Sequence, residues 1–156
     1  MIAVLQRADA ASVVVDGATV GEIEKGLLIL LGVAKEDTEE DAALLCKKIL
    51  ACRIFCDEQD KMNLSVRDIG GSVLVVSNFT LLANYRHGNR PDYMNAAAPD
   101  RANALYEHFT ELVRREGVPV ATGVFGADMR VMLSGNGPVT IVMDSNELKK
   151  KKEKVQ

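Results

Sequence analysis

The chain has 156 residues, 47% of them hydrophobic and 26% charged, which fits one globular domain with its own core. Its net charge of −3 is not typical of a nucleic-acid-binding protein, although residues 149–154 carry five lysines and one glutamate. No segment looks like a signal peptide, and the apolar run at residues 27–33 is too short to cross a bilayer, so we expect a cytoplasmic protein.

The three cysteines, Cys46, Cys52 and Cys56, lie in one segment, and their odd number argues against a disulfide framework. The only imidazoles are His87 and His108, and neither is paired with a cysteine at ligand spacing. We therefore predict no structural metal site.

The first third of the chain has the pattern of β-strands. Residues 12–15 and 18–23 are expected to pair as a hairpin, because Asp16-Gly17 between them favours a tight turn. Residues 27–33 are almost continuously apolar, which predicts a central strand that is buried on both faces.

A helix is predicted next. Thr38 can cap its N-terminus, and the acidic residues 39–41 favour the positive end of the helix dipole. Apolar residues then recur at three- and four-residue spacing and predict its buried face. These residues are Ala42, Leu45, Cys46, Ile49 and Cys52.

Residues 72–76 predict another buried strand, and the polar residues 84–91 predict a loop. Pro99 favours the start of a second helix, which Gly117 ends. The buried face of this helix is predicted from regular apolar spacing. It comprises Ala102, Leu105, Tyr106, Phe109, Leu112 and Val113.

The last third returns to strands at residues 118–122, 129–133 and 139–143, and no repeat or linker divides the chain. The prediction is a single α/β domain in which mixed or antiparallel sheets form a barrel-like core, with two helices packed outside. We assign residues 1–146 to this domain and residues 147–156 to a basic tail, which we expect to be solvated and disordered.

Three segments stand out as candidate sites: residues 77–81, 123–129 and 135–140. Taken singly, each has an ordinary structural interpretation, as hydroxyls that bond nearby backbone, apolar core residues or a tight Gly-Pro turn. A Ser-His-Asp site is not indicated, because His87 falls in a loop and His108 lies off the apolar face of its helix. No glycine loop precedes a helix in the manner of a nucleotide-binding motif.

The order of the motifs resembles the D-aminoacyl-tRNA deacylase family, also described as D-tyrosyl-tRNA deacylases, from Met1 to about Ser145. That family's two signatures are Ser-Gln-Phe-Thr-Leu and Asn-X-Gly-Pro-(Val/Phe)-Thr. Here the first reads Ser77-Asn78-Phe79-Thr80-Leu81, and residues 137–140 match the core of the second. Residues 3–7, 26–33, 61–65 and 125–129 also fit the family pattern.

Two positions depart from the pattern. Asn78 replaces the usual glutamine and is one methylene shorter, and Gly135 stands where the second motif has asparagine. Asn136 fills the variable position instead. The contacts of the amide at position 78 and of the motif's asparagine therefore cannot be carried over from the family pattern.

The resemblance implies hydrolysis of the ester bond of D-aminoacyl-tRNA, and also of glycyl-tRNA mischarged on tRNA-Ala, by a homodimer without metal or cofactor. In this family the Gly137-Pro138 peptide is cis and enters the active site of the partner subunit. Two carbonyls there hold the substrate ammonium, so that the side chain of an L-amino acid collides with the backbone while that of a D-amino acid does not.

The resemblance also assigns roles to individual residues. Arg7 anchors the Gly137-Pro138 loop. Backbone N–H groups near Phe79 and Thr80 stabilise the ester oxyanion, and a ribose 2′-OH of the substrate helps to activate water. Ser77 and Asn78 line the pocket of the tRNA's 3′-terminal adenosine, and Phe125 and Met129 pack near its base. The implied catalytic residues are thus Phe79, Thr80 and Ser77, and the implied substrate-binding residues are Gly137, Pro138, Asn78, Arg7, Phe125 and Met129.

Two alternatives remain at the level of the sequence. One is a related proofreading deacylase with a trans proline and a roomier pocket, which acts on small L-aminoacyl-tRNAs. The other is a non-catalytic nucleic-acid-binding module of the same fold, which the basic tail and the departures at Asn78 and Gly135 favour.

Overall fold

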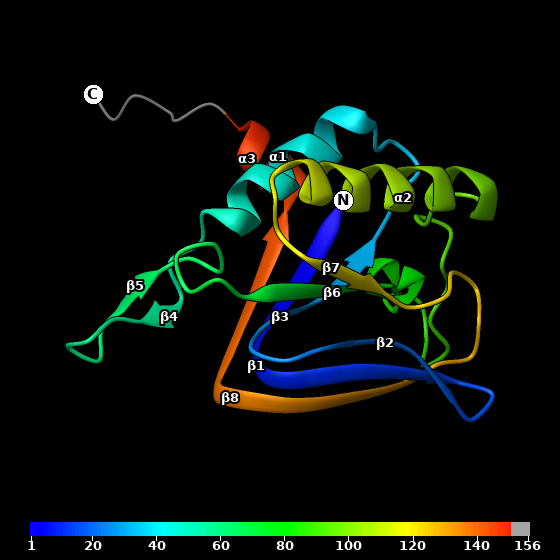
Figure 1. Cartoon of the computed structure of the whole chain (residues 1–156). Coiled ribbons are helices and arrows are strands. Elements are labelled where there is room, and N and C mark those ends of the chain that lie inside the picture. The colour runs from blue at the N-terminus through cyan, green and yellow to red at the C-terminus, as the bar shows by residue number, and fades with distance from the viewer. Residues whose placement is uncertain (151–156) are drawn as a thin grey trace, which may run out of the picture.

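The structure is a computed structural model that describes residues 1–150. In these residues no helix is both long enough and apolar enough to span a membrane. The elements follow one another along the chain as shown in Figure 1. They are β1 (Ile2–Val15), β2 (Ala18–Ile23), β3 (Gly26–Gly32), α1 (Glu39–Leu50), β4 (Phe55–Cys56), β5 (Met62–Leu64), β6 (Ser72–Ser77), the 3-10 helix η1 (Phe79–Leu82), α2 (Pro99–Arg115), β7 (Val120–Thr122), β8 (Arg130–Asp144) and α3 (Ser145–Lys149).

The main sheet has six strands and mixed directions. Its order is β2-β1-β3-β6-β7, and β8 pairs with β1. The long β1 is antiparallel to β3 through residues 2–8, to β2 through residues 11–15, and to β8 along most of its length. The pairs β3–β6 and β6–β7 are parallel. A second, two-stranded sheet is formed by β4 and β5.

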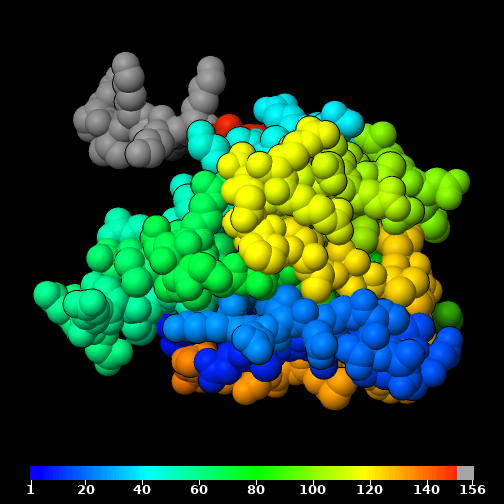
Figure 2. Space-filling model, viewed as in Figure 1, coloured from blue at the N-terminus to red at the C-terminus, as the bar shows by residue number. Residues whose placement is uncertain are grey.

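The two ends of the main sheet approach each other. A Cβ atom on Gly21 of β2 would collide with the carbonyl oxygen of Thr122 in β7, so only glycine permits this approach. The sheet is therefore nearly closed into a barrel, and the helices α1, α2 and α3 pack on one side of it (Figure 1). In the space-filling view the atoms of α2 lie above those of β1 and β2 (Figure 2). The predicted fold class, a single α/β domain with a barrel-like core, is confirmed.

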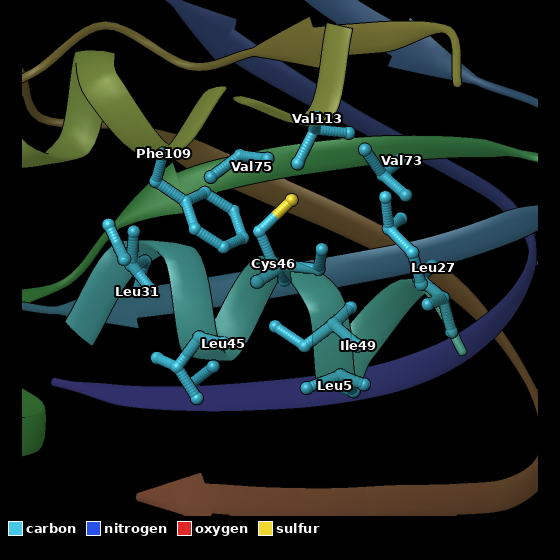
Figure 3. Close-up of a cluster of buried hydrophobic side chains, with 14 of the residues drawn as sticks. Leu5, Leu27, Leu31, Leu45, Cys46, Ile49, Val73, Val75, Phe109 and Val113 are labelled. Carbon is cyan, nitrogen blue, oxygen red and sulfur yellow. The ribbon is translucent and has the colours of Figure 1, made fainter. Parts of the chain in front are cut away.

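The apolar side chains of β3 and β6 divide between two cores. Leu27, Ile29 and Leu31 pack under the helices, together with alternate residues of β6, as Figure 3 shows for part of this cluster. Leu28 points to the other face, into a smaller cluster inside the barrel. The continuous apolar run thus marks a strand that is buried on both faces, as predicted.

The two predicted helices begin where their capping residues indicate. Thr38 and Asp41 form a capping box at the start of α1, and Pro99 is the first residue of α2. Gly117, the second residue after the end of α2, has φ +79°, a conformation that favours glycine. The predicted buried face of α1 is correct except at Cys52, which lies beyond the end of this helix.

The last strand differs from the prediction. Strands at residues 129–133 and 139–143 with a tight turn between them were expected, but β8 runs without interruption from Arg130 to Asp144. The register explains the difference: Gln6 pairs with Thr140 and Ala8 with Gly135, so several residues of β8 bulge out opposite Arg7. The Gly-Pro signal marks this bulge and not a chain reversal.

The beginning of the predicted tail is helical. Residues 145–149 form α3, where Ser145 is buried and Lys149 forms an ion pair with Asp41 of α1 at 2.8 Å. Residues 147–149, which the prediction assigns to the tail, are thus part of α3. Residues 151–156 of the predicted tail lie outside the described residues.

Asp41 links α1 to the end of the chain. Burial raises the pKa of this carboxyl group, but hydrogen bonds from Lys149, Ser145 and Thr38 outweigh that effect and hold the pKa well below its ordinary value. Because the folded state lowers this pKa, Asp41 stabilises the fold above the unfolded pKa of about 4, and the contribution is lost as the pH falls further.

Replacing Asp41 by asparagine should lower the free energy of unfolding at pH 7 by about 3 kcal/mol, because the charges around it lose their partner. Urea unfolding at several pH values measures this effect, and the gap to the wild type should narrow progressively below about pH 4. Glu40→Gln, an exposed change in the same helical turn, is the control. An equal gap at pH 7 and pH 2 would contradict the proposed charge effect.

Candidate active site

A cavity of about 470 Å³ opens where the parallel strands end. The chain leaves β3, β6 and β7 at the same edge of the sheet, and side chains that follow each of these strands line the cavity. The start of α2 closes another side. The lining residues are Leu31, Val33, Ser77, Asn78, Phe79, Tyr93, Ala96, Ala97, Pro99, Ala102, Tyr106, Phe125, Gly126, Ala127 and Met129.

Five of the predicted site residues meet in this cavity. Ser77 ends β6, and Asn78 and Phe79 follow it directly. The segment between β7 and β8 contributes Phe125 and Met129. Two segments about 50 residues apart in the sequence thus form opposite parts of one site.

Aromatic side chains shape the cavity. The ring of Phe79 is 58% exposed and stands edge-on to Tyr93, with ring centroids 4.9 Å apart. Tyr106 is buried and donates its hydroxyl hydrogen bond to the Val75 carbonyl at 2.9 Å. Burial raises the pKa of Tyr106 to about 12, so this phenol is neutral at physiological pH and does not act as a base there.

The backbone after β6 leaves two donors unused. Phe79 and Thr80 are the first residues of η1, and within residues 1–150 their N–H groups donate to no other backbone group. The next N–H, that of Leu81, bonds to the Asn78 carbonyl at 3.4 Å. Two adjacent N–H groups are therefore free to bind an oxygen of a ligand beside the cavity.

The hydroxyl group of Thr80 has a local partner. It donates a short hydrogen bond to the side-chain oxygen of Asn78, and Thr80 does not line the cavity. The amide of Asn78, which is shorter than the family's glutamine, is thus oriented by its own turn. The Asn78 N–H donates to the Leu31 carbonyl at 2.8 Å, which fixes the exit from β6 against β3.

Arg7, Gly137 and Pro138 lie together, but they are not among the residues that line this cavity. The Gly137–Pro138 peptide bond is cis, the isomer that the resemblance implied. Arg7 donates from Nε to the Asn136 carbonyl and from Nη2 to the Asn136 side-chain oxygen, each at 3.1 Å. It also donates from Nη1 to the Ile54 carbonyl at 2.8 Å, so the guanidinium ties this loop to the segment before β4.

Asn136 takes part in this network through both ends of its amide. Its Nδ2 donates to Asp9 at 2.9 Å, while its oxygen accepts from Arg7. Asn136, which occupies the variable position of the motif, therefore attaches the loop to two residues of β1, Asp9 and Arg7.

A shallower hollow of about 480 Å³ adjoins the cavity and shares Ser77, Asn78 and Met129 with it. Apolar residues of β3, β6 and β8 form its floor. Exposed apolar side chains continue along β8, where Val131 is 40% and Val142 67% exposed. Exposed apolar side chains that adjoin a hollow are typical of a binding face.

Part of the cavity wall could not be predicted from the sequence. Tyr93, Ala96 and Ala97 come from the irregular segment before α2, and no periodicity places such a segment in space. Among residues 1–150, no group of three or more histidine, cysteine, aspartate or glutamate side chains is arranged to hold a metal ion.

Comparison with known proteins assigns the family. A sequence model of the family described as D-Tyr-tRNA(Tyr) deacylase matches residues 4–144. The chain belongs to this family. The match covers the cavity, the two free N–H groups and the Gly137–Pro138 loop, so every predicted site residue lies within the deacylase region.

Curated members of the family are similar over nearly their whole length. The D-aminoacyl-tRNA deacylase of Pelobacter propionicus is 54% identical, covering 92% of this chain and 99% of that protein. The D-aminoacyl-tRNA deacylase of Yersinia enterocolitica is 56% identical, covering 90% of this chain and 97% of that protein.

Two solved structures share the deacylase fold. One, named c-Myc DNA Unwinding Element Binding Protein, superposes with a TM-score of 0.88 at 39% identity and covers 92% of this chain and 98% of its own. The other, a probable eukaryotic D-amino acid tRNA deacylase, has a TM-score of 0.79 at 19% identity, over 91% and 97% of the two chains. At that identity the likeness supports the fold alone.

Proposed function

We propose that this protein hydrolyses the ester bond that joins a D-amino acid to the 3′-terminal adenosine of tRNA, releasing the free amino acid and the tRNA. The observation that carries the proposal is the pair of free N–H groups on Phe79 and Thr80 beside an aromatic-lined cavity. The similarity to curated deacylases over more than nine-tenths of the chain supports the same reaction.

The cavity suits the adenosine. Its wall is mostly apolar, and the rings of Phe79, Tyr93 and Phe125 offer surfaces for a purine. Ser77 and the Asn78 amide add a few polar groups at the strand end, where they can fix the orientation of the ribose and base. Met129 also lines the cavity.

With the adenosine seated there, the ester carbonyl would lie against the N–H groups of Phe79 and Thr80. Water attacks the carbonyl carbon, the carbonyl oxygen gains negative charge in the tetrahedral intermediate, and the two N–H groups stabilise that charge. Collapse of the intermediate expels the ribose 3′-oxygen, which takes up a proton. The neutral Tyr106 hydroxyl already donates its hydrogen bond to the Val75 carbonyl and does not act as a base. The 2′-OH of the substrate is therefore proposed to assist the proton transfer.

The Gly137–Pro138 loop is proposed to act in the cavity of a second subunit, which makes the active enzyme a homodimer. Three observations support this arrangement: the loop is exposed, it does not line the cavity of its own chain, and Arg7 and Asn136 hold it in one position. The apolar hollow beside the cavity provides a surface for the partner.

Selection between enantiomers follows from such a loop. When backbone carbonyls hold the substrate ammonium and the N–H groups hold the ester, the side chain can leave Cα in only two directions. The loop blocks the direction of an L-side chain and leaves the other open. Glycine has no side chain to exclude, so glycyl-tRNA, including the species mischarged on tRNA-Ala, is proposed as a second substrate.

A chirality-resolved assay tests this function. We expect the protein to hydrolyse D-Tyr-tRNA and glycyl-tRNA and to leave L-Tyr-tRNA intact, with a D-to-L ratio of kcat/KM of at least about 100, which about 3 kcal/mol of steric rejection provides. Equal rates with both enantiomers would refute selection by the Gly137–Pro138 loop. Hydrolysis of small L-aminoacyl-tRNAs would favour the alternative proofreading deacylase.

The second alternative, a nucleic-acid-binding module without activity, gains one observation from the comparisons. A structure with 39% identity bears the name of a DNA-element-binding protein. A module of this kind would bind tRNA or DNA in the same assay without hydrolysing either enantiomer.

A further inference from the structure

The loop between η1 and α2 has a fixed base. Asn84 and Asp92 exchange backbone hydrogen bonds, each 2.8 Å long, and so close the loop. The Asn84 side chain accepts from the Arg86 N–H at 3.2 Å, and the Asp92 side chain accepts from the Met94 N–H at 3.2 Å. Residues 84–95, which we call the platform, are therefore held in a defined backbone conformation.

The side chains on this platform are of two kinds. Tyr85 is 74% exposed and Met94 71% exposed, which is unusual for side chains of this size. Arg86, His87 and Arg90 are exposed as well. Within residues 1–150 neither Arg86 nor Arg90 forms an ion pair, so these two cations are available to a partner.

The platform adjoins the proposed adenosine cavity. Tyr85 and Arg86 line a hollow of about 450 Å³ together with Asn95. Ala96, which follows Asn95, and Tyr93, two residues before it, line the cavity itself. Tyr93 stands against Phe79, so a ligand that leaves the cavity past this aromatic pair reaches the platform next.

We propose that residues 84–95 bind the unpaired nucleotides that precede the terminal adenosine of the substrate, an inference that rests on the proposed function. An exposed aromatic ring next to unpaired arginines is the combination that recognises single-stranded nucleic acid, because rings stack on bases and guanidinium groups bind phosphates. Tyr85 supplies the stacking surface, and Arg86 and Arg90 supply the charge. A positive platform also attracts RNA locally to a protein whose net charge is −3.

Two substrates with the same ester separate this role from that of the cavity. One is the whole D-aminoacyl-tRNA, and the other is 3′-(D-aminoacyl)adenosine, which occupies the cavity but carries no preceding nucleotide. Tyr85→Ala should lower kcat/KM on the tRNA about 5- to 100-fold, the effect of losing one stacked base, and change it less than about 2-fold on the adenosine ester. Tyr85→Phe, which keeps the ring, should restore the tRNA value.

Salt dependence tests the arginines. In a plot of log kcat/KM against log salt concentration, Arg86→Ala should reduce the slope for tRNA by about 0.7, the value for one phosphate contact to a single strand. Arg115→Ala removes another exposed arginine, one at the end of α2 that pairs with Glu111, and should leave the slope unchanged.

Each result decides between roles. If Tyr85→Ala lowered kcat/KM equally on both substrates, Tyr85 would only support the cavity. If it left kcat/KM on the tRNA unchanged, Tyr85 would not contact the tRNA. Either result overturns the inference. A wild-type protein that hydrolyses neither ester refutes the proposed function, and the inference falls with it. Hydrolysis of tRNA but not of the adenosine ester by the wild type would support recognition beyond the adenosine.

Discussion

Gly137→Ala should lower kcat/KM for a D-aminoacyl-tRNA by about 100-fold, the loss that follows when a reacting group is misplaced by about 1 Å. Gly137 has φ +129°, a backbone conformation that residues with a Cβ rarely adopt. An added Cβ would lie 2.7 Å from the Val139 nitrogen and 2.8 Å from its Cγ2. The loop must therefore move, and the backbone carbonyls proposed to hold the substrate ammonium move with it. Deacylation kinetics with D- and L-Tyr-tRNA measure the effect.

A matched control separates the effect of moving these carbonyls from that of backbone strain. Gly117 also has a positive φ, of +79°, but a Cβ there meets nothing within 4 Å, and this residue lies after α2. Gly117→Ala should destabilise the fold by about 1 kcal/mol and leave enantiomer selection unchanged. If both alanine variants lost the same activity, the loop would have no special role.

The interior strands of the fold could be predicted because their signal is local. Residues 27–33 and 72–76 are apolar on both faces, and this pattern has few explanations other than a strand covered on both sides. The course of β8 could not be predicted in the same way. Gly135 and the Gly137-Pro138 pair favour a turn locally, and only the pairing with β1 keeps the strand continuous through them.

The site divides along similar lines. Ser77, Asn78 and Phe79 stand out as a polar segment at the end of a buried strand, but taken alone this segment has an ordinary structural interpretation, and the resemblance to the family motif is what assigned it to the site. Tyr93 was not predicted, since it lies in an irregular segment whose position depends on tertiary contacts such as the ring of Phe79. The role of Asn136 was also out of reach, because the partners of its amide, Asp9 and Arg7, are more than 120 residues away.

The second large effect is expected from a proline at position 79. Phe79→Pro removes one of the two free N–H groups and should lower kcat about 100- to 1000-fold relative to Phe79→Ala, the loss typical of one oxyanion donor. Both variants lack the aromatic ring of Phe79, but only the proline variant also lacks the backbone N–H, so their difference reports on that N–H. Phe79 is the first residue of η1, and Asn78 before it has φ −148° and ψ 89°, which lies outside the helical region that a following proline disfavours. Single-turnover deacylation measures kcat directly, and equal values for the two variants would exclude Phe79 as a donor.

Mixing the two defective proteins tests whether the site is shared between subunits. Gly137→Ala retains the N–H groups beside its cavity, and Phe79→Pro retains the loop. In a mixed dimer, the cavity of the first subunit would meet the intact loop of the second, which rebuilds one complete site. Since half of the dimers are mixed and each has one working site, an equimolar mixture should regain about a quarter of wild-type activity. If the loop served the cavity of its own chain, every site would keep one defect, and mixing would restore nothing.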